Sequence, residues 1–313
     1  MKKHIIRYVI CTLLIMPRLS KAQIFISGDA GGNGQAKIVN PQPVVGKVFY
    51  KLSYMPDTTK RDSLTQEIFE LDFAKNASMF LSYSTFQRDS LMKKTIEEQM
   101  KNATAGANGE KLIDMLHFDA PMVVSNSQAY SRDKFYTDAA KAGTSLHIMN
   151  IAMATFLIKD STEKINWQIL DSTKDIRGNL CQKAVGESHG RLYTAWFCSD
   201  IPYSFGPRRL NGLPGLILEA HDEKSEVNYT LDHIETIKDT SEVIGLPQDG
   251  IDAAPKDYVK AQEAFQKNPQ AFIQSHGMPQ MQGKENNMRI VVSGRAAPKG
   301  FKKPVNNNPI DLK

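Results

Sequence analysis

The feature that most constrains the fold of this chain is a series of short segments in which apolar and polar residues alternate. Residues 44–55 place Val48, Tyr50 and Leu52 on one side and Lys47 and Lys51 on the other. An alternation with period two is typical of a half-buried β-strand. Similar strand-like segments occur at residues 67–73, 78–83, 167–170, 180–185, 191–198, 216–218 and 226–237. No regular helix separates most of them, which favours antiparallel pairing.

We therefore predict a strand-rich α+β fold. Its centre is a single domain over residues 44–277, with a curved antiparallel sheet, half-barrel-like in the manner of periplasmic lipoprotein carriers, and a few helices. Residues 67–73 and 78–83 are expected to form a hairpin, and residues 89–101 and 255–275 have helical character. The apolar run 147–158 fits a buried strand or a helix, and its β-rich surroundings favour the strand.

The two ends of the chain differ from this domain. Residues 1–22 combine basic residues, a short apolar run and the small residues Ser20 and Ala22, the pattern of a secretory signal peptide with cleavage before Gln23. Its apolar run is too short to span a bilayer, so the mature chain is expected to have no transmembrane segment. Residues 23–43 are predicted to be a flexible leader. Residues 278–313 form a basic tail rich in Asn, Pro and Gly, either solvated or an arm that touches an anionic envelope surface or a partner.

The net charge of the chain comes from the signal-like segment. The chain has 39 Lys and Arg against 34 Asp and Glu, and five of the basic residues lie within residues 1–22, which contain no acidic residue. The remaining chain therefore carries 34 of each sign. Net charge gives no support to nucleic-acid binding.

Cysteine usage predicts one covalent link. Cys11 lies in the signal-like segment, so Cys181 and Cys198 remain. A two-residue turn at His189-Gly190 would place these two cysteines directly opposite each other on neighbouring strands, at a Cα separation that a disulfide accepts. We predict a structural disulfide, as suits an exported protein. Two buried free thiols are the alternative; the CxxC spacing of redox-active pairs is absent.

The sequence contains no recognisable catalytic or metal-binding motif. The histidines of the mature chain are scattered, and His221-Asp222 and Asp232-His233 are neighbours that would point to opposite faces of a strand. No strand-to-helix GxSxG elbow is expected, because Gly186-Glu187-Ser188-His189-Gly190, which fits the string, lies between two predicted strands; no phosphate-binding loop is present. We expect no metal and no cofactor. The histidines concerned are His117, His147, His189, His221, His233 and His276.

The stretch from Gly206 to Asp222 combines turn residues with an apolar run. Arg208-Arg209 is a candidate contact for an anion or a partner. Gly212 and Pro214-Gly215 are expected to fix a bend, after which Leu216, Ile217 and Leu218 begin a buried strand beside the cysteine hairpin. The hexapeptide Gly212, Leu213, Pro214, Gly215, Leu216, Ile217 is therefore predicted to be structural, without a catalytic role.

This hexapeptide resembles the signature of the GLPGLI family, the Porph_ging type, of exported Bacteroidota proteins. Further matches in the same order are Asn166-Trp167, Thr173-Ile176, Cys181-Ala184, Gly190-Arg191, Tyr193-Phe197, Ile201-Pro202 and Gly206-Pro207, and the closing Asn308-Leu312 resembles the family's C-terminal end. The resemblance implies an exported protein of unknown function, located in the periplasm, at the outer membrane or outside the cell.

Two functions stay open from the sequence. The first is a non-catalytic binding or assembly protein whose curved sheet holds an apolar ligand, a lipid or a segment of an envelope partner. An open apolar cavity on the concave face would support it, and a face filled by side chains would contradict it. The second is an envelope hydrolase whose histidine, carboxylate and Ser or Thr meet only in the folded chain.

Overall fold

The computed structural model describes residues 37–87, 91, 111–113, 131, 134–140, 144–151, 154–159, 164–238, 241–268, 271–272, 275–276, 288–290 and 306–312. Its strands are β1 (Ile38–Pro43), β2 (Gly46–Tyr54), β3 (Thr65–Phe73), β4 (Ala77–Ser82), β5 (Lys111–Ile113), β6 (Lys134–Asp138), β7 (Thr144–Ile151), β8 (Ala154–Lys159), β9 (Gln168–Ile176), β10 (Asn179–Ser188), β11 (Arg191–Cys198), β12 (Leu216–Asp222), β13 (Val227–Thr236), β14 (Val243–Pro247), β15 (Ile251–Ala253) and β16 (Met288–Ile290). Its helical elements include a 3-10 turn, Arg61–Ser63, and α2, Pro255–Lys267.

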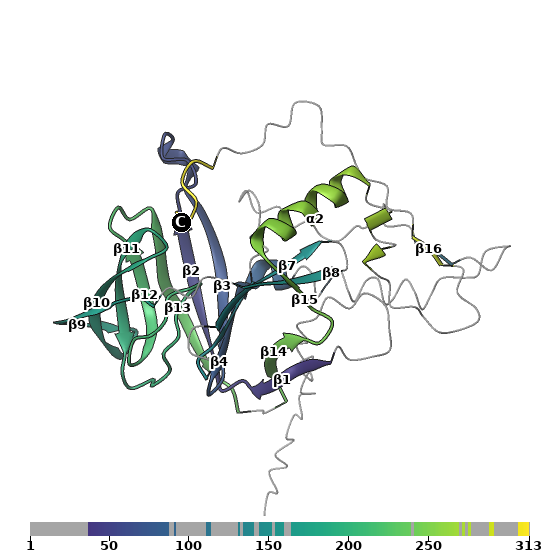
Figure 1. Ribbon diagram of the computed structural model, residues 1–313. Coiled ribbons are helices and arrows are strands. Elements are labelled where there is room, and N and C mark those ends of the chain that lie inside the picture. The colour runs from purple at the N-terminus through teal and green to yellow at the C-terminus, as the bar shows by residue number, and fades with distance from the viewer. Residues whose placement is uncertain are drawn as a thin grey trace, which may run out of the picture.

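Twelve of these described strands form one open sheet, in the order β15-β8-β7-β6-β4-β3-β2-β13-β12-β11-β10-β9. Neighbours pair antiparallel except for β15 and β8, which are parallel. Two small pairs lie apart from it, β1 with β14 and β5 with β16. The predicted strand-rich, mainly antiparallel α+β fold is confirmed, and Figure 1 shows that the sheet does not close into a barrel.

Most predicted strands are present with small shifts at their ends. The hairpin of β3 and β4 is confirmed, as are β2, β10, β11 and β13. The run 147–158 is strand, as favoured, but it is divided between two antiparallel strands, β7 and β8. The helix expected over 255–275 begins at Pro255, and α2 ends at Lys267. Residues 83–87 are helical, earlier than the predicted helix at 89–101, most of which lies outside the described residues.

Two segments expected to lie outside the domain contact it. Residues 38–43, assigned to the flexible leader, form β1 and pair with β14. Residues 306–312, assigned to the basic tail, dock on the domain through hydrogen bonds to Pro56 and His189. Local composition did not predict these contacts, because Asn, Pro and Gly indicate only a weak tendency to form helix or strand. They carry no information about partners far along the chain.

The inner face of the curved sheet carries the main core. One cluster of buried residues spans the sheet and includes Tyr50 of β2, Phe69 of β3, Phe135 of β6 and Phe197 of β11. Five strands separate β6 from β11 in the sheet order. The sheet must curl for these side chains to meet. In agreement, the hydroxyl of Tyr50 donates a 2.6 Å hydrogen bond to the carbonyl of Ile217 across the intervening β13.

The inner face is filled by the chain itself. The connection between β11 and β12, residues 199–215, contributes Phe205, Leu210 and Leu213 to the same core, each at most 3% exposed. Tyr203 from this connection packs on Phe73 of β3, with ring centroids 4.8 Å apart. The described part of the inner face is therefore packed with side chains, which is the outcome that counts against an open lipid cavity.

The outer face is covered at the other end of the sheet. Met79, Tyr136 and Ile148 form a second buried cluster with Ile244 of β14, so the small β1–β14 pair lies over β4, β6 and β7. Helix α2 lies beside β7 and β8 in Figure 1 and packs on their opposite face, where Tyr258 contacts Phe156 in a third buried cluster. Among the described residues, no helix has the length and apolar character needed to cross a bilayer.

Candidate functional site

The cysteine hairpin has the register predicted from its turn. Ser188 pairs with Arg191 and Gln182 with Phe197. The same register, extended by one residue, places Cys181 opposite Cys198. His189 and Gly190 both have positive φ, 48° and 79°, as a two-residue hairpin turn requires. The turn chemistry of two residues thus fixed the position of both cysteines.

The predicted disulfide between these cysteines is not formed in the structure. Cys181 and Cys198 are buried free thiols. Burial, together with the neighbouring Cys198, raises the pKa of the Cys181 thiol to about 12. A thiol in this state is a weak nucleophile, which speaks against redox catalysis. Opposition in the register brings the two cysteines near each other, but it does not fix the side-chain torsions that a disulfide needs.

The hexapeptide 212–217 joins the inner connection to β12. Gly215 lies against the backbone of β11, where an added Cβ would sit 2.2 Å from the carbonyl oxygen of Cys198. Leu216 and Ile217 begin β12, and their amides donate to the carbonyls of Ile201 and Phe205. The described contacts of the hexapeptide therefore join β12 to β11 and to the connection that fills the inner face.

Arg208 and Arg209 hold a carboxylate that belongs to this chain. Both form ion pairs with Asp311, and Arg208 binds it through Nε and Nη2. Both guanidinium groups also lie over the ring of Phe135, at 4.5 and 4.6 Å. Burial alone would raise the pKa of Asp311, but the charges and hydrogen bonds of the two arginines hold it below its usual value. The predicted anion contact is thus occupied by the C-terminal segment.

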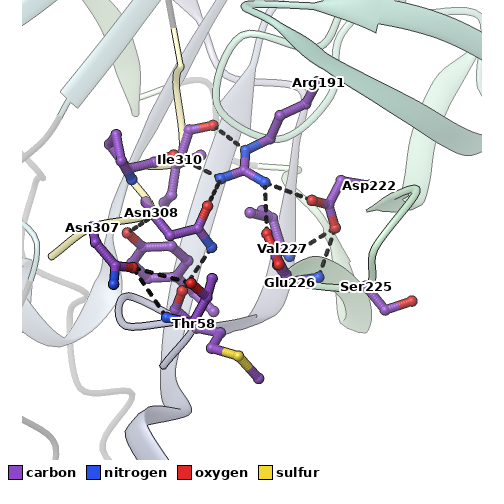
Figure 2. Close-up of polar contacts among 12 residues, drawn as sticks. Thr58, Arg191, Asp222, Ser225, Glu226, Val227, Asn307, Asn308 and Ile310 are labelled. Atoms are coloured by element: carbon purple, nitrogen blue, oxygen red, sulfur yellow. Dashed lines mark hydrogen bonds and ion pairs between the residues drawn. The ribbon is translucent and has the colours of Figure 1, made fainter. Parts of the chain in front are cut away.

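Arg191, at the start of β11, is the centre of this arrangement (Figure 2). Its side chain is 4% exposed and forms a 2.6 Å ion pair with Asp222 at the end of β12. Its Nε donates to the carbonyl of Ile310 at 2.8 Å and its Nη2 to the carbonyl of Pro309 at 2.7 Å. Nη2 also donates to the side-chain oxygen of Asn308. One buried arginine therefore binds three consecutive residues of the C-terminal segment.

Asp222 is held in place by backbone donors. Its Oδ1 accepts hydrogen bonds from the amides of Glu226 and Val227 at 2.7 and 3.0 Å, while Oδ2 faces Arg191. Two amide hydrogen bonds and the arginine pair thus satisfy both oxygens of this buried carboxylate. The β12–β13 turn therefore positions Arg191 toward the C-terminal segment.

We call residues 306–312 the C-terminal clasp. Asn308 donates from its side chain to the carbonyl of Met55, and Tyr54 donates to the carbonyl of Asn308. Asn307 accepts from the amide of Thr58 (Figure 2) and donates to Asp57. Ile310 packs against the main core, and the amide of Leu312 donates to the carbonyl of His189. The clasp thereby joins the end of β2, the β10–β11 turn and residues 208–209.

The sequence patterns do not reveal this site, although two of its segments carry the family resemblance. Gly190-Arg191 and Asn308-Leu312 were both among the residues that carry the family resemblance. That both segments match the same family was the available sequence signal that they contact each other in the fold. Neither composition nor periodicity relates two segments more than 100 residues apart.

Three groups in the described residues resemble parts of a hydrolase site. In one, the exposed Ser275 has its Oγ 2.9 Å from Nδ1 of His276, whose ring stacks on Phe272. The Oγ of Ser188 lies 3.0 Å from Nδ1 of His189, but Ser188 is 2% exposed. Asp232 and His233 were expected on opposite faces, which is wrong: a register shift between Leu231 and His233 brings Asp232 Oδ2 to 2.7 Å from His233 Nδ1. That pair is about half exposed, and His233 stacks on Phe49. The described part of the chain contains no group of three or more His, Cys, Asp or Glu arranged to hold a metal ion.

A further charged cluster is buried on the outer side of β2 and β3. Lys47 Nζ lies 2.7 Å from Glu70, 3.2 Å from Asp72 and 3.1 Å from Glu242. Burial and the neighbouring Glu70 raise the pKa of Asp72 well above its usual value. Burial would lower the pKa of Lys47, but Asp72 and Glu70 outweigh it and raise that pKa. This arrangement holds an ammonium group of the chain itself.

Comparison with known proteins covers only part of the chain. A family model described as "Protein of unknown function (Porph_ging)" matches residues 149–219, which include the cysteine hairpin and the hexapeptide. No curated protein matches this chain. Two solved structures, described as "Structure of PNGF-II in P21 space group" and "Structure of PNGF-II in C2 space group", are similar with TM-scores of 0.43 and 0.42. Each is 12% identical and covers 69% of this chain, which spans only 32% of that chain. The predicted resemblance is thus confirmed over residues 149–219, where this chain matches the Porph_ging family, whose function is unknown.

Proposed function

We propose that this chain is an exported cell-envelope protein with a non-catalytic binding or assembly role, and that it binds an extended polypeptide segment. The signal-like residues 1–22 support export. The observation that carries the binding role is the clasp itself. Arg191 binds two main-chain carbonyls of this segment. Hydrogen bonds to main-chain groups let a protein bind a peptide with little dependence on its sequence.

The same site also selects side chains. Asn308 is 6% exposed and is bound on both sides, by Arg191 and by the carbonyl of Met55. Asp311 pairs with Arg208 and Arg209. A segment with asparagine and, three residues later, an acidic residue therefore matches the surface. Desolvated hydrogen bonds to charged groups discriminate strongly, because a missing partner leaves a buried charge unpaired.

A lipid or other apolar ligand is less well supported than a peptide. The inner face, where such a ligand would lie, is filled by Phe205, Leu210 and Leu213. The hydrolase alternative is less well supported: Ser188 is buried beside His189. Ser275 is exposed beside His276, but the ring of His276 is otherwise held by the carbonyl and the ring of Phe272 rather than by a carboxylate.

Peptide binding tests this function directly. The double variant Asn308→Ala/Asp311→Ala should vacate the site while all three arginines remain. A fluorescent peptide with the sequence of residues 306–313 should then bind the variant, whereas the wild-type chain, whose site is filled, should bind it weakly. A fluorescent fatty acid should bind neither protein.

The matched control adds Arg208→Ala/Arg209→Ala to the vacated variant and should abolish peptide binding. A folded, vacated variant that fails to bind the peptide, or a wild-type chain that binds the fatty acid tightly, would refute the proposal.

A further inference from the structure

Three consecutive asparagines of the clasp, residues 306–308, contact one short stretch of chain, residues 54–58. This stretch includes the end of β2 and precedes the 3-10 turn. The amides of Asn307 and Asn308 both donate to the carbonyl of Pro56, at 3.0 and 3.2 Å. These main-chain hydrogen bonds hold the asparagine side chains beside the stretch.

The side-chain amide of Asn307 is bound at both of its ends. Its oxygen accepts from the amide of Thr58 at 3.1 Å (Figure 2), and its nitrogen donates to Oδ1 of Asp57 at 3.0 Å. The pKa of Asp57 is lowered, first by a hydrogen bond from Thr59 and also by the one from Asn307. Because an ionised carboxylate only accepts hydrogen bonds, this position requires a donor where asparagine has its amino group.

The side-chain amide of Asn308 is also bound at both ends, and it is buried. Its oxygen accepts from Nη2 of Arg191, and its nitrogen donates to the carbonyl of Met55 at 2.8 Å. Asn308 is 6% exposed, so a side chain without these hydrogen bonds would leave buried polar groups unsatisfied. A guanidinium group on one side and a carbonyl on the other fit a group that accepts at one end and donates at the other, as a carboxamide does.

We infer that residues 55–58 and Arg191 recognise two successive carboxamides, so that the segments this site binds carry an Asn-Asn pair. This inference rests on the proposed function, and it adds the second asparagine and the stretch that selects the pair. Aspartate has nearly the shape of asparagine, but at position 307 its carboxylate would face that of Asp57 with no donor between them. Leucine at position 308 would leave Arg191 and the carbonyl of Met55 without this partner.

Competition between peptides tests this preference. The receiving protein is the vacated chain Asn308→Ala/Asp311→Ala, and the probe is the fluorescent peptide with the sequence of residues 306–313. Unlabelled peptides displace it, one with the native sequence and others with single substitutions. We expect the Asn308→Leu peptide to bind about tenfold more weakly or worse, because two buried groups lose their partner. The Asn307→Asp peptide should bind about threefold to tenfold more weakly, because it loses one hydrogen bond and faces a like charge.

Asn306→Asp is the matched control in the peptide. The hydroxyl of Tyr54 donates to the side-chain oxygen of Asn306 at 2.9 Å, and a carboxylate accepts this hydrogen bond equally well. The Asn306→Asp peptide should therefore bind at least as tightly as the native one. It carries the same added charge as the Asn307→Asp peptide, so a difference between the two reports the position and not the net charge.

A change in the receiving chain identifies the selecting residue. Adding Asp57→Asn to the vacated chain should bring the Asn307→Asp peptide close to the native affinity, because the like charge is gone. The deficit of the Asn308→Leu peptide should stay the same, because its partners are Arg191 and Met55. A merely structural role of Asp57 would weaken every peptide alike.

The outcomes separate this inference from the proposed function. If the native peptide binds the vacated chain and all substituted peptides bind equally well, the asparagine preference is wrong and segment binding stands. If the native peptide does not bind the folded, vacated chain, the proposed function is wrong and this inference is wrong with it.

Discussion

At the scale of single residues, the molecule places charge where burial makes it costly and pairs each charge closely. Arg191 and Asp222 have side chains only 4% and 3% exposed, and Lys47 and Glu70 are similarly covered. Such pairs add little net stability over apolar residues, but the removal of one partner leaves a buried charge uncompensated. Their main effect is to fix which segments meet, and at Arg191 the segment is the clasp.

Replacing Arg191 should therefore destabilise the protein strongly. We expect Arg191→Met to lower the free energy of unfolding by about 3–5 kcal/mol, because Asp222 stays buried without its ion pair. Lys174→Met is the matched control: Lys174 is 44% exposed and pairs with Glu219, so its loss should cost at most about 1 kcal/mol. Urea unfolding measures both, and equal effects of the two substitutions would contradict the account.

The buried Asp72 predicts a pH dependence of stability. Its folded pKa is raised by burial and by Glu70, so between its unfolded pKa and its folded pKa the native state binds more protons than the unfolded state. Stability from this group is thus present at acidic pH and decreases as the pH rises through that window. Asp72→Asn keeps a neutral side chain at every pH, so the stability of the wild type relative to the variant should fall as the pH rises above about 4, the usual pKa of an aspartate.

Urea unfolding at several pH values measures this difference. Asp171→Asn, at an exposed position on β9, controls for the loss of a surface carboxylate. A wild-type advantage that grows as the pH rises would show that Asp72 is ionised in the folded protein.

At the scale of elements, the β10–β11 hairpin and the hexapeptide form one unit. The hairpin provides the two opposed cysteines, and the hexapeptide lays β12 against β11 with Gly215 touching the backbone at Cys198. The connection between them fills the inner face. These residues lie within the region that matches the family model, so the matched region includes the connection that fills the inner face of the sheet.

Gly215→Ala should disrupt this unit. The new Cβ would meet the carbonyl of Cys198 at 2.2 Å, and two backbones cannot separate there without unpairing β12 from β11. We expect a loss of at least about 3 kcal/mol, the upper end of overpacking effects. Gly178→Ala is the control, with open space around its Cβ and a positive φ, and should cost about 1–2 kcal/mol. Thermal unfolding that leaves the Gly215 variant at wild-type stability would disprove the close contact.

The two cysteines permit a decisive chemical test. Because both thiols are buried and the pKa of Cys181 is raised to about 12, the native protein should resist alkylation. Unfolding without reductant then separates the alternatives. Two modified cysteines identify the free thiols of the structure, and no modification identifies the disulfide predicted from the hairpin register. Mass spectrometry of the purified protein reads the result.

At the scale of the whole molecule, the clasp ties together parts that the sheet leaves apart. It bonds to Met55 and Pro56 after β2, to Arg191 at the start of β11, and to Arg208 in the inner connection. Deletion of residues 306–313 should raise amide hydrogen exchange at the β10–β11 turn and residues 55–58. Exchange in β7 and β8 should stay unchanged, because those strands belong to a different buried cluster. A uniform increase would show that the clasp supports the whole fold instead.

By itself, the sequence determined the local features of this protein. Alternation predicted β2, β3, β4 and β13, and the His189-Gly190 turn predicted the register that opposes Cys181 to Cys198. These features depend on neighbours a few residues apart, for which backbone geometry sets simple periods. The hexapeptide identified the family resemblance, and its turn residues predicted the start of β12.

Only the tertiary structure decided what fills the inner face and what the arginines bind. Arg191 meets Ile310 across 119 residues of sequence, and Arg208 meets Asp311 across 103. Such contacts depend on how the sheet curls, which side-chain periodicity does not encode. The split of residues 147–158 into β7 and β8 has the same cause, because a strand buried on both faces shows no alternation to mark its end. The clasp therefore lies in a tail whose composition indicates a solvated chain or an arm toward an envelope surface or a partner, and not a segment bound to its own domain.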